Sequence, residues 1–179
     1  MKIVIVEQLS EIQELALGAM QKITFPDVDD DEAREDFFHP KSAHVLALEG
    51  EEVVGWAGIH EKNIEYEGRK IRLGGYGIGT HPDWRRKGIA NKLAESALQY
   101  LAGRGCDIAF LSVELPNAAS IKLHQKNGFV HLPVQFSWRD VHGTLKEDRG
   151  GMIAALNSKP LFELVLNGQS VFHVGDGYW

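Results

Sequence analysis

The chain has 179 residues, of which 44% are hydrophobic and 25% are charged. This length and composition are typical of one globular domain and disfavour a two-domain enzyme. The single cysteine, Cys106, excludes a disulfide framework within the chain and the cysteine-rich zinc patterns. The formal net charge of -6 disfavours a nucleic-acid-binding protein and suits a cationic partner.

The amino-terminal segment is predicted to form a strand and then a helix. The strand covers Lys2–Val6, and the helix begins after Ser10, which is placed to be its N-cap. The apolar run at the start is too short for a signal peptide, and no segment approaches the ~20 apolar residues of a membrane span. We therefore expect a cytoplasmic protein. A second, acidic helix is predicted over Asp27–Phe38, closed by His39-Pro40 because the residue before a proline avoids the α region.

Three antiparallel strands are expected next. They cover Ala43–Leu48, Val53–Ile64 and Lys70–Thr80. The sequences Glu49-Gly50-Glu51 and Glu67-Gly68 separate them and are typical of turns. The segment therefore predicts a meander that follows the two helices.

Helices and strands then alternate in the prediction. Apolar residues at every fourth position predict a helix over Arg86–Ala102. The continuous apolar run Ile108–Val113 is typical of a central strand buried on both faces. A short helix over Asn117–Lys126, a strand over Gly128–Trp138 and extended structure over Leu161–Val174 follow. The predicted fold class is mixed α/β, in the order β-α-α-β-β-β-α-β-α-β with a β-rich carboxyl-terminal tail.

The segment Tyr76–Leu93 has the features of an anion-binding site. It joins a glycine-containing strand to a long helix through a proline turn and the basic run Arg85-Arg86-Lys87. The first amides of a helix lack internal partners and lie at the positive end of its dipole, so they can bind a phosphate. Gly88 and Ala90 leave room for a pyrophosphate near the backbone. A basic helix start with a turn glycine explains the same residues without a ligand, and both interpretations stay open.

Two motifs in this order resemble the Gcn5-related N-acetyltransferases (GNAT). The sequence HPDWRRKGIA at residues 81–90 resembles their acyl-CoA motif Arg/Gln-x-x-Gly-x-Gly/Ala, with matches at Arg85, Gly88 and Ala90. The sequence NAASIKLHQKNGF at residues 117–129 resembles their pattern Asn-x-x-Ala/Ser-x-x-Leu-Tyr-x-x-x-Gly-Phe. The predicted element order also agrees with that family's fold. The resemblance covers residues 1 to about 138.

This resemblance implies that acetyl-CoA is the co-substrate and that no metal takes part. Residues 1–179 would form a single domain, with an acyl-CoA core to about residue 138 and an acceptor-side tail over residues 139–179. The amides of residues 86–90 would hold the pyrophosphate, and the pantetheine would pair with the strand that ends at residue 80. The predicted cofactor-binding residues are Ile78, Gly79, Thr80, Arg85, Arg86, Lys87, Gly88, Ile89, Ala90, Asn91 and Asn117.

Three glycines alternate along the strand that ends at residue 80, namely Gly75, Gly77 and Gly79. Glycine weakens a strand and marks either a bulge or a close backbone approach. A ligand that runs alongside the strand explains the pattern, and a loosely packed sheet edge is the alternative.

His124 is a departure from the family pattern. It stands where most relatives have a tyrosine that donates a proton to the departing CoA thiolate. Histidine suits that role because its pKa near neutrality makes the imidazolium a competent acid. The alternative is an exposed helix histidine, with water or the cofactor's own amide as the source of the proton.

The attacking amine must be neutral, so the reaction also needs a proton acceptor. Three candidate bases are Glu114, at the end of the central strand, His81, and the terminal carboxylate of Trp179. Strand amides of residues 78–80 are candidate donors to the oxyanion. No G-x-S-x-G nucleophile elbow is present, and Cys106 lies in a Gly-Cys-Asp turn, so direct attack is favoured over a covalent acyl-enzyme.

The acidic cluster Asp27–Glu32 is the sequence feature that bears on the acceptor. It lies between the two helices that border the acceptor side in this fold. The cluster either caps and stabilises its helix or attracts a polyamine-like or aminoglycoside-like cation. A narrower resemblance, to the aminoglycoside 2'-N-acetyltransferases, favours the cation. It covers residues 64–76, Asp83-Trp84-Arg85 and the ending Gly175–Trp179, whose last carboxylate lines the aminoglycoside site in those enzymes. The chain departs from them at Ile78, where they have a glutamate.

We therefore expect an acetyl-CoA-dependent N-acetyltransferase that acetylates a primary amine of a small cationic molecule by direct attack in a ternary complex. The expected partner is that small-molecule amine, without nucleic acid or membrane, and a homodimer is compatible with the sequence. Two alternatives stay open. One is a non-catalytic acyl-CoA sensor, which the missing tyrosine and glutamate favour, and the other is an N-terminal protein acetyltransferase, whose peptide groove the tail could block.

Overall fold

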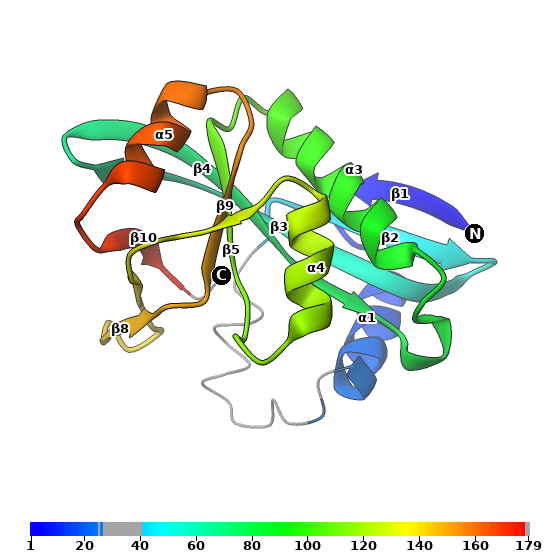
Figure 1. Cartoon of the computed structure of the whole chain (residues 1–179). Coiled ribbons are helices and arrows are strands. Elements are labelled where there is room, and N and C mark those ends of the chain that lie inside the picture. Colours follow the sequence, from blue (N-terminus) through cyan, green and yellow to red (C-terminus); the bar gives the residue numbers. More distant parts are fainter. Residues whose placement is uncertain (25, 27–40, 178–179) are drawn as a thin grey trace.

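A computed structural model describes the chain except for residues 25, 27–40, 178 and 179 (Figure 1). Strands and helices alternate along it, as the sequence predicts. The strands are β1 (Lys2–Val6), β2 (Ala43–Glu49), β3 (Glu52–Tyr66), β4 (Arg69–Thr80), β5 (Ile108–Ser112), β6 (Val130–His131), β7 (Phe136–Arg139), β8 (Leu145–Asp148), β9 (Gly151–Ala155) and β10 (Phe172–Asp176). The helices are α1 (Glu11–Thr24), α3 (Ile89–Gly103), α4 (Ala118–Lys126) and α5 (Lys159–Asn167), with a 3-10 turn over Pro82–Trp84.

The described strands form two sheets. Seven of them make a mixed sheet in the order β1-β2-β3-β4-β5-β9-β6, in which β4 and β5 are parallel and the other neighbours are antiparallel. The other three make a smaller sheet in the order β10-β7-β8. The strand β9 lies within the tail defined from the sequence, yet it sits between β5 and β6 in the large sheet. The mixed α/β prediction is confirmed.

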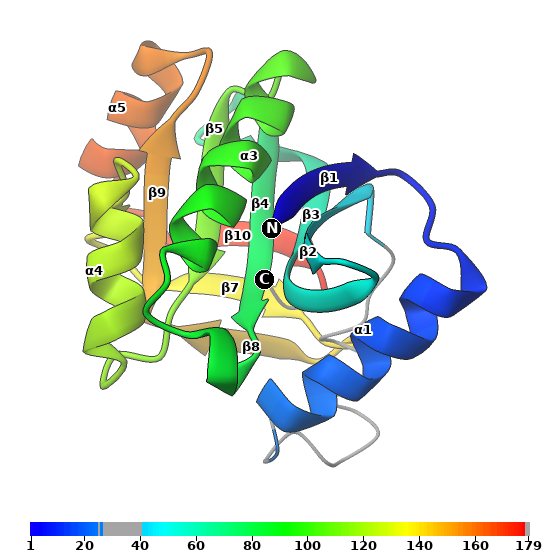
Figure 2. The same cartoon turned by 90° about the vertical axis from the view of Figure 1, so that its right-hand side faces the viewer.

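The large sheet is covered on both faces. Gly55 of β3 lies beneath α3, since a Cβ atom there would come within 2.8 Å of Ile89. The next residue, Trp56, faces the other side because successive strand side chains alternate, and there it packs against Leu17 and Met20 of α1. The small sheet packs on that same side. Figure 2 shows α3 in front of the large sheet and the small sheet behind it.

The meander of β2, β3 and β4 is confirmed, and so is the capped start of α1. Oγ of Ser10 accepts a hydrogen bond from the Gln13 amide at 3.3 Å, and the Gln13 side chain accepts one from the Ser10 amide at 2.9 Å. This reciprocal pair is a capping box, which satisfies two amides that have no partner within the helix. The predicted central strand is β5, which lies inside the large sheet.

Two predicted extended segments are correct only in part. The segment Gly128–Trp138 is divided into β6 and β7, which belong to different sheets, with Pro133 between them. Proline lacks the N–H that a ladder needs, so the strand cannot continue through it. The first half of Leu161–Val174, through Asn167, belongs to helix α5, and the last three residues, from Phe172, belong to β10. Ser158 caps the start of α5 by accepting a hydrogen bond from the Leu161 amide at 3.3 Å. Pro160 in the first turn also suits a helix start.

The predicted acidic helix over Asp27–Phe38 lies outside the described residues. The same is true of the predicted terminal carboxylate of Trp179 and of the acidic cluster. In the described part of the chain, no helix combines the length and apolar character needed to span a bilayer.

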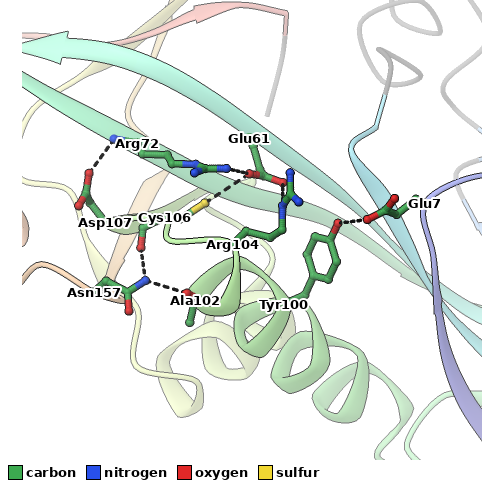
Figure 3. Close-up of polar contacts among 9 residues, drawn as sticks. All are labelled: Glu7, Glu61, Arg72, Tyr100, Ala102, Arg104, Cys106, Asp107 and Asn157. Atoms are coloured by element: carbon green, nitrogen blue, oxygen red, sulfur yellow. Dashed lines mark hydrogen bonds and ion pairs between the residues drawn. The ribbon is translucent and has the colours of Figure 1, made fainter.

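A polar cluster fastens the end of α3 to the β3–β4 hairpin (Figure 3). The Glu61 carboxylate accepts hydrogen bonds from Arg72 Nη2 at 2.7 Å and from Arg104 Nε at 3.2 Å, and its side chain is only 11% exposed. The Sγ atom of Cys106 lies 4.0 Å from the same carboxylate. Burial, with a further contribution from the charge of Glu61, raises the pKa of the Cys106 thiol to about 11. The cysteine is therefore a neutral thiol at pH 7, a poor nucleophile.

We expect Glu61→Gln to lower the free energy of unfolding by about 1–3 kcal/mol, because it removes the shared charge from two arginines and leaves them close together. Urea denaturation measures the difference. The matched control is Glu163→Gln, which breaks the exposed pair of Lys159 and Glu163 (3.6 Å, 80% and 54% exposed) and should cost no more than about 0.5 kcal/mol. Equal effects of the two substitutions would contradict a structural role for the cluster.

Candidate functional site

The turn between β4 and α3 has the backbone shape of an anion-binding site. Arg86 and Gly88 both have positive φ, at 64° and 78°, so the predicted helix over Arg86–Ala102 begins only at Ile89. The first amides of α3 have no partner within the helix, as at any helix N-terminus. A Cβ atom at Gly88 would have no heavy atom within 4 Å. The space beside this glycine is open.

The basic side chains around this turn are exposed and partly held in place. The Nε atom of Arg85 donates a hydrogen bond to the Thr80 carbonyl at 3.4 Å. The Nζ atom of Lys87 lies 4.2 Å from the centre of the Trp84 ring, a cation–π contact. The hydroxyl of Thr80 is buried and has no hydrogen-bond partner among the described residues. A buried hydroxyl without a hydrogen-bond partner lowers the stability of the fold. Thr80 is the last residue of β4, directly before this turn.

Two of the predicted cofactor-binding asparagines use their side chains within the protein. Asn91 donates to Glu95 at 2.6 Å and accepts a hydrogen bond from Asn127 at 3.2 Å, which links α3 to α4. Asn117 caps α4, accepting a hydrogen bond from the Ser120 amide at 3.1 Å. A cofactor contact of either residue would therefore involve the backbone or the remaining capacity of the amide group.

Strand β4 leaves its parallel neighbour before it ends. The β4–β5 pairing covers only Leu73–Gly75, whereas β4 stays paired with β3 through Thr80 without a break in register. The predicted bulge in the glycine-rich segment is therefore absent from the β3–β4 ladder. Residues 76–80 continue along β3 alone, so their other edge is not used by β5. This edge begins beside the turn described above.

The three alternating glycines of β4 face away from α3. Gly77 is opposite Gly58 of β3 in the register, and directly opposed residues share a face of the sheet. A Cβ atom at Gly77 would have no heavy atom within 4 Å. The intervening residues, Tyr76 and Ile78, pack on the α3 side. The end of β4 thus has an apolar face towards α3 and a face without side chains on the opposite side.

His124 lies on the α3 side, in contact with Tyr76. Its Nδ1 atom is 3.2 Å from the Tyr76 hydroxyl oxygen, and each residue is only 3% exposed. Phe129 stands edge-on to both rings, with centroids 5.6 Å from His124 and 6.1 Å from Tyr76. The alternative of an exposed helix histidine is therefore wrong. Tyr76 is not among the predicted site residues, and its position between two glycines of β4 is the signal that could have drawn attention to it.

Burial sets the protonation state of this pair. It lowers the pKa of His124 to about 4 and raises the pKa of Tyr76 above its usual value. Moving a charged form out of water is unfavourable, so at pH 7 the imidazole and the phenol are both neutral. The neutral ring of His124 differs from the imidazolium expected from the sequence. A role of His124 at the sulfur has to be performed by the neutral ring.

The predicted bases are separate from this pair. Glu114 is exposed just after β5, and its carbonyl accepts a hydrogen bond from the Asn117 amide at 2.8 Å. His81 caps the 3-10 turn: its Nδ1 accepts a hydrogen bond from the Asp83 amide at 3.3 Å and lies 3.9 Å from the Asp83 carboxylate. Trp179 is not among the described residues. A general base is therefore not singled out by the geometry.

On the opposite face of the sheet, Lys41 has an unusual environment. Burial, and next the charge of Lys62, lower the pKa of Lys41 to about 7. Burial, and next the charge of Lys41, lower the pKa of His44. The Nδ1 atom of His44 accepts a hydrogen bond from Trp56 Nε1 at 3.0 Å. The Nζ atom of Lys62 donates to the Asp176 carbonyl in β10. This side of the sheet therefore carries basic groups, a signal that the sequence analysis did not find.

Comparison with known proteins gives a family. Residues 7–129 match the model of the acetyltransferase (GNAT) family. A mycothiol acetyltransferase of Saccharopolyspora erythraea is 31% identical over 96 residues, which are 54% of this chain and 30% of that protein. N-alpha-acetyltransferase 30 of Saccharomyces cerevisiae is 32% identical over 72 residues, which are 39% of this chain and 41% of that protein. The matched region thus spans less than half of either relative.

The fold has close counterparts among solved structures. The ribosomal-protein-S18-alanine N-acetyltransferase from Escherichia coli superposes with a TM-score of 0.61 at 16% identity, covering 87% of this chain and 94% of that chain. At such low identity the likeness concerns the fold alone. The overall fold is therefore shared with a protein of little sequence similarity.

Proposed function

The chain belongs to the acetyltransferase (GNAT) family, and from this premise we propose that it transfers the acetyl group of acetyl-CoA to a primary amine. The observation that carries the proposal is the turn at Gly88, where the first amides of a helix, open space and basic side chains coincide at the start of α3. The proposed contacts are those expected from the two motifs. They are the predicted cofactor-binding residues at the end of β4, in the turn and at the starts of α3 and α4.

The residues fit a CoA pyrophosphate in three respects. The first amides of α3 can donate to phosphate oxygens at the positive end of the helix dipole. Arg85, Arg86 and Lys87 are exposed beside them, which adds positive charge. The absence of a side chain at Gly88 leaves the approach open, and the buried Thr80 hydroxyl supplies one more unused donor. Acetyl-CoA would bring the activated acetyl thioester.

The proposed reaction is a direct transfer. The amine nitrogen attacks the thioester carbonyl carbon, so that an N–C bond forms and the C–S bond breaks. The amine loses one proton and the sulfur gains one, which balances the step. Backbone amides of residues 78–80 are the proposed donors to the developing oxyanion. His124 is the residue that we place beside the sulfur, because it occupies the tyrosine position of the motif.

The proposed acceptor is a small-molecule amine. A cationic one, aminoglycoside-like or polyamine-like, is supported by the net charge of -6 and by the resemblance of the ending Gly175–Trp179. The name of the relative from Saccharopolyspora erythraea, mycothiol acetyltransferase, also refers to a small molecule, which supports a small-molecule acceptor. A protein amino terminus is the second candidate, favoured by the similarity to N-alpha-acetyltransferase 30.

An amine panel tests the proposal. The full chain is incubated with acetyl-CoA and an aminoglycoside, spermidine or a peptide with a free amino-terminal alanine, and the released thiol and the acetylated amine are measured. We expect release well above the rate without amine for at least one acceptor, and none with Gly88→Glu. Turnover of the peptide alone would contradict the small-molecule acceptor. Binding of CoA without turnover of any amine would favour the acyl-CoA sensor.

A further inference from the structure

The buried pair of Tyr76 and His124 lies where β4 has separated from β5. The hydroxyl oxygen of Tyr76 is 3.2 Å from Nδ1 of His124. Among the described residues, neither side chain has another hydrogen-bond partner. The ring of Phe129 packs edge-on against both of them. The two polar groups therefore depend on one another.

The direction of their hydrogen bond follows from where the hydrogens are. The phenol of Tyr76 is neutral and carries one hydrogen, and the neutral ring of His124 carries one N–H. Each possible direction leaves one hydrogen without an acceptor in the described part of the chain: donation from Nδ1–H would leave the phenol hydrogen, and donation from the phenol leaves the Nε2 hydrogen. The phenol is the stronger acid and the unprotonated ring nitrogen is the stronger base, so the hydrogen bond from the phenol to Nδ1 is the favoured one. Tyr76 therefore donates to Nδ1, and the hydrogen of His124 is on Nε2.

We propose that Tyr76 is a positioning residue of the acetyl transfer, whose hydroxyl holds His124 as the Nε2–H tautomer so that Nε2 can donate a hydrogen bond to the departing thiolate. The inference rests on the proposed function, which places His124 beside the sulfur. It replaces the charged histidine with a chain of two hydrogen bonds, from Tyr76 to Nδ1 and from Nε2 to sulfur.

The proton balance of the transfer is unchanged by this arrangement. Nε2–H stabilises the charge that develops on sulfur as the C–S bond breaks, but the ring keeps its proton. The proton that the sulfur finally receives is the one that the amine loses when the N–C bond forms. Donation from Tyr76 polarises the ring and strengthens Nε2 as a donor, because hydrogen bonds in a chain reinforce one another. The second hydrogen bond of a histidine is also what fixes its tautomer.

The first test needs no ligand. Nitrogen NMR of the full chain with labelled histidine, assigned with His124→Phe, reports which ring nitrogen of His124 carries the hydrogen at pH 7. We expect a protonated Nε2 and an unprotonated Nδ1. A protonated Nδ1 in the parent protein would overturn the proposal, whatever the effect of any variant on activity.

The second test removes only the hydroxyl, with Tyr76→Phe. The matched control is Tyr66→Phe, because Tyr66 is equally buried at 4% exposure and donates to the Ser170 carbonyl at 3.1 Å, in a different cluster. We expect Tyr76→Phe to mix the two tautomers of His124 and to raise the pKa of the thiol of bound CoA by about one unit, a tenfold lower thiolate fraction, followed by its ultraviolet absorbance. Tyr66→Phe should change neither.

The outcomes separate the inference from the proposed function. A parent protein that does not bind CoA in calorimetry contradicts the proposed function. A parent protein that binds CoA, together with a Tyr76→Phe variant whose tautomer and thiol pKa equal those of the parent, contradicts the role of Tyr76 alone. If Tyr76→Phe does not fold, the tautomer of the parent protein still decides.

Discussion

Replacement of Gly88 by glutamate is expected to abolish CoA binding, with a loss of affinity of at least about 100-fold in calorimetry. Gly88 has a φ of 78°, which side chains rarely tolerate, and the space that its missing Cβ leaves is open. A glutamate would fill that space and place a negative charge where the first amides of α3 would hold a pyrophosphate. Strain and charge both oppose the ligand.

The control for this substitution is a glutamate at another glycine with positive φ, away from the proposed site. Gly68, in the β3–β4 turn, has a φ of 74° and no heavy atom within 4 Å of its would-be Cβ. We expect Gly68→Glu to cost stability by a similar amount but to leave CoA affinity within about twofold of the parent value. If Gly88→Glu binds CoA as tightly as Gly68→Glu does, the turn is not the pyrophosphate site and the proposed function loses its main support.

The β2–β4 meander and the start of α3 could be predicted because their signals are local. The turns at Gly50 and Gly68 adopt positive φ and divide three β-rich segments, so the sequence marks the strand ends directly. The helix α5 also has local signals, since Ser158 and Pro160 are typical of a helix start, but its apolar run predicts extended structure. The prediction fails there because a short apolar segment is compatible with both a helix and a strand.

The position of β9 could not be predicted in the same way. It joins β5 on one side and β6 on the other, so its environment depends on two segments that precede it in the chain. Its five residues, Gly151–Ala155, contain only two β-branched or long apolar side chains, Met152 and Ile153. Pairing between distant segments decides the strand, and no local pattern encodes it.

The candidate site also has a part with local sequence signals and a part that depends on contacts between distant segments. The cofactor-binding residues from Arg85 to Ala90 follow one another in the sequence, so a motif can name them, and they stay predictions until a ligand is measured. The pair of Tyr76 and His124 joins residues 48 positions apart, on β4 and α4. The burial that keeps His124 neutral comes from this contact and from Phe129, and neither follows from the α4 motif alone.

Burial of His124 is expected to make the stability of the protein depend on pH between about 6.5 and 4. The pKa of His124 is lowered from 6.5 to about 4 by burial, so in this window the unfolded chain binds a proton that the folded chain does not. Stability therefore rises with pH across the window and is lost as pH falls. The loss from this residue is about 2 kcal/mol between pH 7.5 and pH 5, and about 3 kcal/mol by pH 4.

Urea denaturation of the parent and of His124→Phe at pH 7.5 and pH 5 measures this effect as a difference of differences. The pKa of His44 is also lowered, so His44 too lowers the stability as pH falls. Its contribution is the same in both proteins and cancels when their losses of stability are compared. Lys41, with a pKa of about 7 against 10.5 unfolded, acts mainly above this window. The matched control is His131→Phe, since the His131 side chain is exposed on β6 and should leave the parent pH dependence unchanged. A His124→Phe variant that loses as much stability as the parent between the two pH values would show that His124 is not held neutral, and the hydrogen-bond chain from Tyr76 would lose its basis.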